Sequence, residues 1–112
     1  MTDRNDNVGY AEYKTFHVDS EADGFMLNVG GFSGDKGDGL VAHSGHKFST
    51  KDRDQDTNSG NCAVKRSGAW WYSNCSVSNL NGDYSRSSGL RGVFWLEPSS
   101  PLKKTEMMLR CK

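Results

Sequence analysis

Three aspartates at alternating positions form the segment of the sequence with the clearest potential for chemistry. Asp52, Asp54 and Asp56 lie in the string DRDQD, and the residues TNSGN that follow are typical of a loop. Hard cations such as Ca²⁺ bind about six to eight oxygen atoms from carboxylates, main-chain carbonyls and water, and one irregular loop can supply several of them. The string is therefore chemically compatible with a cation site such as one for calcium. Taken alone, it favours a solvated acidic turn, partly neutralised by Lys51 and Arg53.

A calcium site at this string would not be an EF-hand loop. An EF-hand has glycine directly after the third acidic position and a bidentate glutamate at the twelfth position. This sequence has Thr57 and Ala63 at those places. A calcium loop completed by main-chain oxygens between Asn58 and Gly60 remains open.

The cysteines predict an oxidising environment. Cys62 and Cys75 flank a short stretch that contains glycine and tryptophan, and a disulfide between them would contribute about 3 kcal/mol to stability. Cys111 would then be free, joined to another chain, or paired with a segment outside this chain. Because the N-terminus has no secretory signal, we expect the chain to be a fragment of a secreted, extracellular protein.

No residue pattern indicates zinc binding or catalysis. His43 and His46 have an HxxH spacing, but no third ligand follows at a zinc-site spacing, so we expect surface histidines in a loop. The serines lack the sequence context of an activated nucleophile, and His17 lies in no dyad-like pattern. We therefore expect no enzymatic activity.

Charge and length exclude several classes of protein. The 112 residues include 14 basic and 14 acidic side chains, which gives a formal net charge of zero. Such a chain lacks the positive field that nonspecific nucleic-acid binding requires. It also lacks a run of about 18 apolar residues that could span a membrane. We expect one domain or part of one, with no nucleic-acid partner and no membrane insertion.

The apolar pattern predicts mainly β-strands, with short helices possible within residues 60–80. Strands are also predicted at residues 92–95 and 103–110, separated by EPSSP, whose prolines prevent a helix. Residues 47–61 contain one apolar side chain, Phe48, so contacts other than hydrophobic packing must order them. A hairpin around the polar DSEADG is predicted by two sets of near-alternating apolar residues: Tyr13, Phe16 and Val18, then Phe25, Leu27 and Val29.

The aromatic cluster in GAWWY is the densest of the chain. Such side chains line ligand pockets, but they also fill cores beside disulfides. We interpret Trp70 and Trp71 as core residues at least as readily as ligand contacts, and we expect Tyr72 to be more exposed.

One tripeptide matches an acceptor for N-linked glycosylation. Asn74, Cys75 and Ser76 fit the pattern Asn-x-Ser. A disulfide at Cys75 would hold Asn74 against the fold, so we expect no modification there.

The order of several motifs resembles one known family. The strings KFSTKDRDQD, GNCA, WWYSNC, NLNG, GVFW and LKKTEMMLR occur in this order. They resemble the second half of the fibrinogen C-terminal domain, the module of fibrinogen chains, ficolins, tachylectins, angiopoietins and tenascins. Upstream, YKTFHVDSEADGFMLNVGGFSGDKGDGL fits the same pattern, so the resemblance covers the chain from about Tyr10. It implies an α+β fold in which part of an antiparallel sheet is followed by a loop-rich calcium-binding subdomain.

The resemblance also implies the domain boundaries. Residues 1–9 would be an N-terminal extension, and residues 10–112 a partial domain whose first half lies outside this chain. The sheet would comprise about residues 10–50 and 92–112, and the calcium and recognition loops about residues 51–91. Oligomerisation would arise only from upstream segments outside this chain.

The resemblance assigns the metal ligands. It implies that Ca²⁺ is held by the side chains of Asp54 and Asp56 and by the main-chain carbonyls of Asn58 and Gly60, with Asp52 in support. It further implies a Cys62–Cys75 disulfide and a cis peptide bond between Asn74 and Cys75.

The implied function is non-catalytic recognition of acetylated carbohydrates or acetyl groups in a pocket beside the calcium ion. The residues expected to line this pocket are Trp71, Tyr72, Asn74, Cys75 and Ser76. A protein-interaction module of the angiopoietin or tenascin kind, in which calcium is structural, is the alternative. Gly89 and Leu90 favour this alternative, because the family usually has aromatic and acidic pocket residues there.

Overall fold

The strands pair into three small antiparallel sheets, β1 with β6, β2 with β3, and β4 with β5. The computed structural model describes residues 1–85, 89–96 and 101–110. The strands are β1 (Thr2–Asp3), β2 (Ala11–Val18), β3 (Leu27–Gly34), β4 (Ser78–Asn79), β5 (Phe94–Trp95) and β6 (Leu102–Lys104). The helices are two short 3-10 helices, η1 (Glu21–Asp23) and η2 (Val41–His43), and one α-helix, α1 (Cys62–Arg66). The predicted α+β class is confirmed. No described helix has the length and apolarity to cross a membrane.

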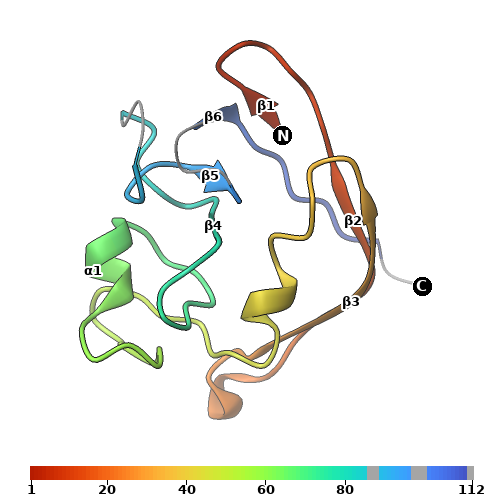
Figure 1. Cartoon of the computed structure of the whole chain (residues 1–112). Coiled ribbons are helices and arrows are strands. Elements are labelled where there is room, and N and C mark those ends of the chain that lie inside the picture. The colour runs from red at the N-terminus through yellow and green to blue at the C-terminus, as the bar shows by residue number, and fades with distance from the viewer. Residues whose placement is uncertain (86–88, 97–100, 111–112) are drawn as a thin grey trace.

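The hairpin β2–β3 forms one side of the molecule, and α1 with its flanking loops forms the opposite side (Figure 1). The strands pair Tyr13 with Phe32 and Phe16 with Val29. Tyr13, Phe16 and Val29 are half-buried and pack against the core, whereas Lys14 and Thr15 are exposed. The alternation that predicted the hairpin is thus confirmed, although Phe25 lies in the connection and not in a strand.

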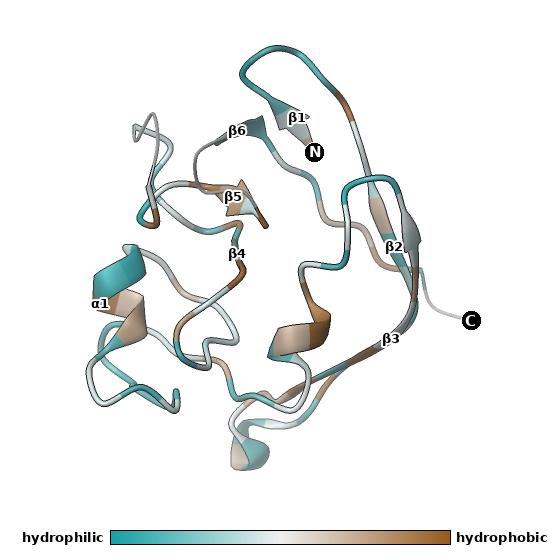
Figure 2. Cartoon of the chain, in the orientation of Figure 1, coloured by the Kyte–Doolittle hydropathy of each residue, from teal (hydrophilic) through white to brown (hydrophobic). Residues whose placement is uncertain are grey.

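The core lies between the hairpin and the loop-rich part of the chain, and the apolar residues of β5, Phe94 and Trp95, are buried there (Figure 2). Trp71 joins the two parts. Its ring lies edge-on to Phe16 of the hairpin, with ring centroids 6.1 Å apart, and to Phe48, at 5.3 Å. Trp70 adds a third edge-on contact at 5.0 Å. Edge-to-face pairs of this kind contribute beyond the area that they bury.

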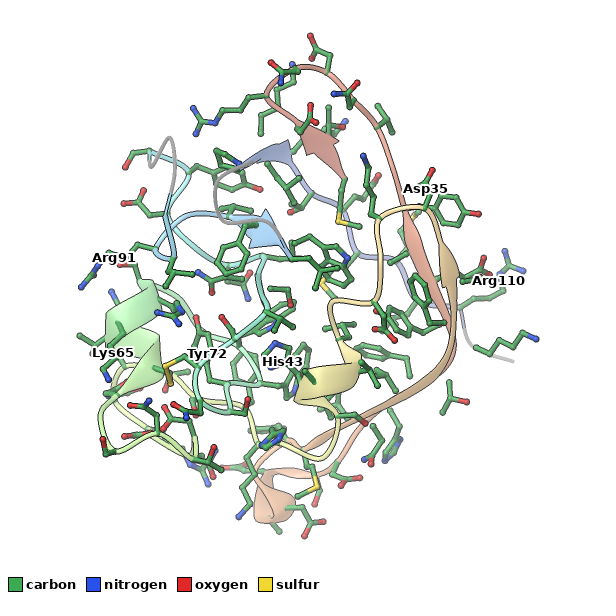
Figure 3. The ribbon with its side chains drawn as sticks, in the orientation of Figure 1. Asp35, His43, Lys65, Tyr72, Arg91 and Arg110 are labelled. Atoms are coloured by element: carbon green, nitrogen blue, oxygen red, sulfur yellow. A yellow bond between two sulfur atoms is a disulfide. The ribbon has the colours of Figure 1, made fainter. Side chains whose placement is uncertain are left out.

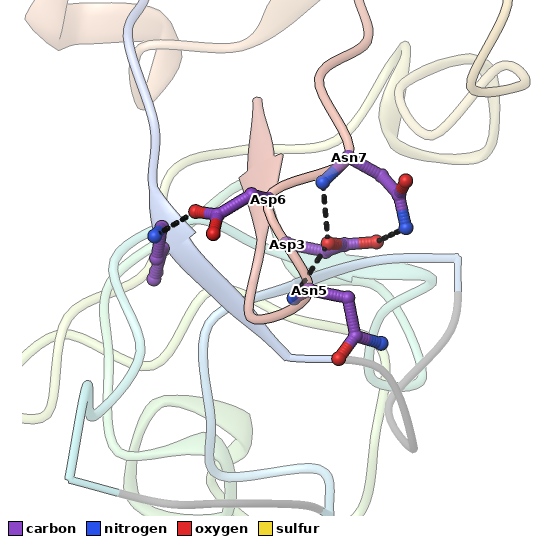
Figure 4. A network of polar contacts seen from close by, with 5 residues as sticks. Asp3, Asn5, Asp6 and Asn7 are labelled. Carbon is purple, nitrogen blue, oxygen red and sulfur yellow. Dashed lines mark hydrogen bonds and ion pairs between the residues drawn. The ribbon is translucent and has the colours of Figure 1, made fainter.

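The first nine residues, which we predicted to be an extension, pack onto the C-terminal part of the chain. In β1, Thr2 and Asp3 pair with β6. The Asp3 carboxylate then accepts hydrogen bonds from the main-chain N–H groups of Asn5 and Asn7, each at 2.9 Å, and Asp6 forms an ion pair with Lys103 (Figure 4). These polar contacts fix a tight turn beside the β1–β6 pair.

The predicted C-terminal strands are shorter than expected. β5 contains two residues rather than the predicted 92–95, and β6 ends at Lys104 rather than continuing to residue 110. A strand needs hydrogen bonds to a neighbour, and the structure assigns no strand partner to residues 105–110 within the described part of the chain. Met108 is accordingly 81% exposed. Cys111, for which we left the pairing open, lies outside the described residues.

His43 is a core residue, so our prediction of a surface histidine was wrong. The side chain is 1% exposed. Its Nδ1 lies 2.9 Å from the carbonyl oxygen of Trp71, and its Nε2 accepts a hydrogen bond from the main-chain N–H of Val77 at 3.2 Å. These contacts require a neutral ring with the proton on Nδ1. Burial lowers the pKa of His43 to about 4, although the contact with the Trp71 carbonyl opposes this shift.

We predict that His43 makes the fold less stable in mild acid. Its pKa falls from 6.5 in the unfolded chain to about 4 in the folded one, so the unfolded state binds the proton more tightly. The stabilisation is complete above pH 6.5 and is lost as the pH falls towards 4. Between about pH 7.5 and pH 5 the free energy of unfolding should drop by about 2 kcal/mol from this residue.

Urea unfolding at a series of pH values measures this effect. The His43→Gln variant is the comparison, because its side chain does not titrate. The free energy of unfolding of the two chains is compared between about pH 7.5 and about pH 5. If it falls as much for the variant as for the natural chain, the assignment of this effect to His43 is wrong.

Candidate calcium and recognition site

Hydrogen bonds rather than apolar packing order the segment that leads into the acidic string. Ser49 and Trp70 exchange main-chain hydrogen bonds at 2.8 and 3.2 Å. The Ser49 hydroxyl accepts a hydrogen bond from the N–H of Gln55 at 3.0 Å, and the Gln55 side chain donates to the carbonyl of Phe48 at 2.6 Å. The prediction that contacts other than packing order residues 47–61 is confirmed. We call residues 51–61 the calcium loop.

The second and third aspartates of the string lie next to each other. The Asp54 carboxylate accepts a hydrogen bond from the N–H of Asp56 at 3.3 Å. The Asp56 carboxylate accepts one from the N–H of Asn58 at 3.0 Å and one from the N–H of Cys62, the first residue of α1, at 2.9 Å. One carboxylate is therefore fixed between the loop and the helix, and the other lies beside it.

Two neighbouring carboxylates create an electrostatic cost at this point. Burial raises the pKa of Asp56, the N–H of Cys62 opposes the rise, and the Asp54 carboxyl adds to it. A divalent cation between the two carboxylates would remove the repulsion that causes this last effect. The atoms that these two side chains offer to a cation are all carboxylate oxygens, which suits Ca²⁺.

The side chains available for a cation are few. In the part of the chain that the structure describes, no group of three or more histidine, cysteine, aspartate or glutamate side chains is arranged to hold a metal ion. A site in the calcium loop would therefore combine the two carboxylates with main-chain oxygens. The predicted set of Asp54, Asp56 and the carbonyls of Asn58 and Gly60 fits this requirement.

Asp52 is bound to the turn that precedes the paired carboxylates. Its carboxylate accepts a hydrogen bond from the Thr50 hydroxyl at 2.5 Å, which lowers the pKa of Asp52. Thr50 and Arg53 exchange main-chain hydrogen bonds at 3.1 Å. The side chain of Asp52 thus stabilises the start of the calcium loop, in line with the supporting role that we predicted.

The calcium loop is linked to the disulfide. The predicted bond between Cys62 and Cys75 is present, and Figure 3 shows its sulfur atoms near the labelled Tyr72. The N–H of Thr57 donates to the carbonyl of Ser73 at 3.1 Å. The Asn58 side chain also donates to the Asn74 side chain. The peptide bond before Cys75 is cis, as the resemblance implied. The loop is thereby joined to the segment that contains the predicted ligand-binding residues, which we call the recognition segment (residues 71–76).

Only part of the recognition segment reaches the surface. Asn74 is exposed and Ser76 is half-buried, whereas Trp71, Tyr72 and Cys75 are buried. The indole N–H of Trp71 donates to the carbonyl of Phe25 at 2.9 Å, inside the molecule. Ligand contact is thus open to the side chain of Asn74 and to the main chain around it.

Tyr72 is fully buried, so our prediction that it is the more exposed aromatic residue was wrong. Its hydroxyl donates to the Asn79 side chain at 2.6 Å. The side-chain amide nitrogen of Asn79 donates to the main-chain carbonyls of Arg66 and Gly92, at 2.9 and 3.0 Å. Asn79 thus gives a partner to the phenol inside the core and connects α1 to the chain before β5. The NLNG string contains this residue, but nothing in its pattern predicted the contact with Tyr72.

We predict that Tyr72→Phe lowers stability without changing ligand recognition. The substitution leaves the buried carbonyl of Asn79 without its donor, which costs about 1–3 kcal/mol. Urea unfolding measures the loss. If Tyr72→Phe instead abolishes ligand binding while its unfolding curve is unchanged, the phenol contacts the ligand and its assignment to the core is wrong.

Main-chain donors are available in the recognition segment. The N–H groups of Cys75 and Ser76 donate no hydrogen bond to any residue that the structure describes. Buried or partly buried N–H groups almost always have a partner. Two adjacent donors without one, at the buried Cys75 and the half-buried Ser76 next to the exposed Asn74, are a candidate contact for a ligand carbonyl or carboxylate.

A cavity of about 290 Å³ lies elsewhere on the molecule. Its lining residues come from the N-terminal turn, the Asp35–Lys36 loop, β5 and β6. The predicted recognition residues do not line it. Recognition at residues 74–76 would therefore use the loop surface and not this cavity.

Comparison with known proteins identifies the family. The sequence matches the family described as fibrinogen beta and gamma chains, C-terminal globular domain, over residues 1–112. Fibrinogen C domain-containing protein 1 of Macaca fascicularis is 42% identical over 121 residues, which covers 98% of this chain and 28% of that protein. Ficolin-3 of Homo sapiens is 42% identical over 117 residues, covering 98% of this chain and 39% of that protein. The chain thus spans well under half the length of these relatives.

Solved structures agree with this assignment. The fibrinogen-like globe domain of human ANGPTL6 superimposes with a TM-score of 0.85 and 38% identity, over 91% of this chain and 50% of that chain. A lamprey fibrin D-dimer, solved with the peptide Gly-His-Arg-Pro-amide, gives a TM-score of 0.82 and 26% identity, over 91% of this chain and 40% of that chain. Because the family model spans residues 1–112 and a relative is 42% identical over 98% of the chain, this chain belongs to the fibrinogen C-terminal domain family.

Proposed function

We propose that this chain is the calcium-binding part of an extracellular recognition module, and that it binds acetylated carbohydrates or other acetyl-bearing ligands without catalysing a reaction. The observation that carries the proposal is the pair of main-chain N–H groups at Cys75 and Ser76, which have no partner within the described residues. The carbonyl oxygen of an acetyl group would accept hydrogen bonds from them. The Asn74 side chain, exposed beside them, would contact the rest of the ligand.

Calcium would act on the shape of the site and would not touch the ligand. Asp54 and Asp56 would hold the ion with the carbonyls of Asn58 and Gly60, and the ion would neutralise the two carboxylates. The contact between the Asn58 and Asn74 side chains would transmit this order to the recognition segment. A segment that is already ordered loses less conformational entropy when a ligand binds.

Relatives supply independent support. The chain resembles ficolins, and this resemblance implies capture of acetyl groups. Ficolin-3 is among its relatives. The lamprey fibrin D-dimer was solved in complex with a peptide ligand.

Retention on a resin that carries N-acetylglucosamine tests the proposal. We expect the chain to be retained in calcium and eluted by a chelator, by free acetate or by N-acetylglucosamine. A resin that carries glucosamine without the acetyl group is the matched control and should not retain the chain. Passage through the acetylated resin in calcium, by a chain that binds calcium and is folded, would disprove acetyl recognition.

A protein-interaction module with structural calcium is the second candidate. Gly89 and Leu90 favour it, because both are exposed and neither supplies the aromatic or acidic side chain that the family pattern has there. Leu90 is 44% exposed and offers an apolar contact to a protein partner. Calcium-dependent stabilisation without retention on the acetylated resin would support this candidate over the first.

A further inference from the structure

We infer that Asn74 is a site of N-linked glycosylation, and that a glycan there covers the recognition segment. The inference rests on the extracellular location proposed above, because the modification occurs in the secretory pathway. The tripeptide from Asn74 to Ser76 has the required pattern. From the sequence we expected the disulfide to hold Asn74 against the fold, and the structure contradicts that reason.

The side chain of Asn74 faces solvent. Asn74 is exposed although Cys75, which follows it, is buried and disulfide-bonded. Its amide oxygen accepts the hydrogen bond from the Asn58 side chain. Its amide nitrogen has no hydrogen-bond partner among the described residues. A glycan attached to this nitrogen therefore fits the folded chain without breaking a contact of the Asn74 side chain.

Ser76 supplies a second, independent observation. Its hydroxyl is buried and has no hydrogen-bond partner among the residues that the structure describes. A buried hydroxyl without a partner destabilises a fold, and alanine would avoid the cost. The hydroxyl thus has no structural role in the folded chain. Recognition of an Asn-x-Ser acceptor by the transferase, in contrast, requires this hydroxyl.

The chemistry is a group transfer to the amide nitrogen. The Asn74 side-chain nitrogen attacks the anomeric carbon of an oligosaccharide that is carried on a lipid diphosphate. A new carbon–nitrogen bond forms, the bond from that carbon to the diphosphate oxygen breaks, and the lipid diphosphate leaves with the electron pair. The amide loses one proton to a base of the transferase. The step must precede folding of the segment, because the Ser76 hydroxyl that the transferase recognises is buried in the folded chain.

Attachment at Asn74 would place the glycan next to the main-chain donors of Cys75 and Ser76. The modified nitrogen belongs to the residue directly before them in the chain. A bulky oligosaccharide there would obstruct access of another ligand to the same N–H groups. The chain would therefore exist in an unmodified form that binds acetyl groups and a glycosylated form that does not.

The test is expression of the full chain behind a secretion signal in a eukaryotic cell, followed by peptide mapping by mass spectrometry. We expect a peptide with a glycan on Asn74, and its conversion to aspartate by peptide N-glycosidase. Ser76→Ala is the matched variant, because it removes the acceptor pattern and no hydrogen bond. It should lose the glycan completely, whereas Ser76→Thr should keep it.

Chain retained inside the cell is analysed together with secreted chain, so that poor folding does not hide the result. If Asn74 is unmodified in both fractions of the natural chain and of Ser76→Thr, the inference is wrong. The acetylated resin is a separate measurement. If the glycosylated form binds it as well as the unmodified natural chain produced in bacteria does, the glycan does not cover the site. If neither form binds, acetyl recognition fails while glycosylation at Asn74 stands.

Discussion

Asp54→Ala will abolish the stabilisation of the chain by calcium, whereas Asp52→Ala will leave most of it in place. Asp54 lies beside Asp56 in the calcium loop and is one of the two carboxylates proposed to hold the ion. Asp52 is hydrogen-bonded to Thr50 and has no place in the proposed ligand set. The two substitutions remove the same charge within the same loop, so they form a matched pair.

The size of the effect follows from mass action. Extracellular calcium modules bind with dissociation constants of about 10⁻⁴ to 10⁻³ M. At about 10 mM calcium this gives about 1.4 to 2.7 kcal/mol of stabilisation, or a rise in melting temperature of roughly 5 to 10 °C. Thermal unfolding with and without a chelator measures it. If Asp54→Ala and Asp52→Ala lose the same fraction of the rise, the ligand assignment is incorrect.

Removal of the disulfide should have the second large effect. The Cys62→Ala/Cys75→Ala double variant should lose about 3 kcal/mol of stability, because the unfolded chain gains the freedom that the cross-link had removed. It should also bind calcium more weakly. Asp56 is hydrogen-bonded to the N–H of Cys62, and the Asn58 side chain to that of Asn74, so movement of either half of the disulfide disturbs the loop.

Urea unfolding and calcium titration of the double variant check this prediction. The natural chain after mild reduction is the control, because it has the same cross-link removed without a change of sequence. Both should show a lower unfolding midpoint and a higher calcium dissociation constant. An unchanged calcium affinity in both would show that the loop is ordered independently of the disulfide.

Local patterns in the sequence predicted the hairpin and made a disulfide between Cys62 and Cys75 plausible, and the structure has both. The apolar residues Tyr13 and Phe16, spaced among polar residues, predict a partly buried strand, and both pack against the core. The cysteine pair is separated by 13 positions, and both members lie in one compact region. Each of these features depends on residues that are close together in the chain.

The misassigned residues depend on contacts between distant segments. Tyr72 is buried because Asn79 gives its hydroxyl a partner, and His43 is buried because Trp71 and Val77 satisfy both ring nitrogens. A polar aromatic side chain is equally compatible with surface and core until such partners are known. For the same reason the apolar residues after β6, with Met108 among them, predicted a strand that the described part of the chain does not pair.

Isothermal titration of the purified chain with calcium tests the central claim most directly. We predict one binding event per chain with a dissociation constant of about 10⁻⁴ to 10⁻³ M, accompanied by a rise in the thermal transition measured on the same preparation. Magnesium, which demands a tighter octahedral arrangement, should bind much more weakly. A folded, disulfide-bonded chain that releases or absorbs no heat with millimolar calcium, and whose thermal transition does not move, would contradict the account.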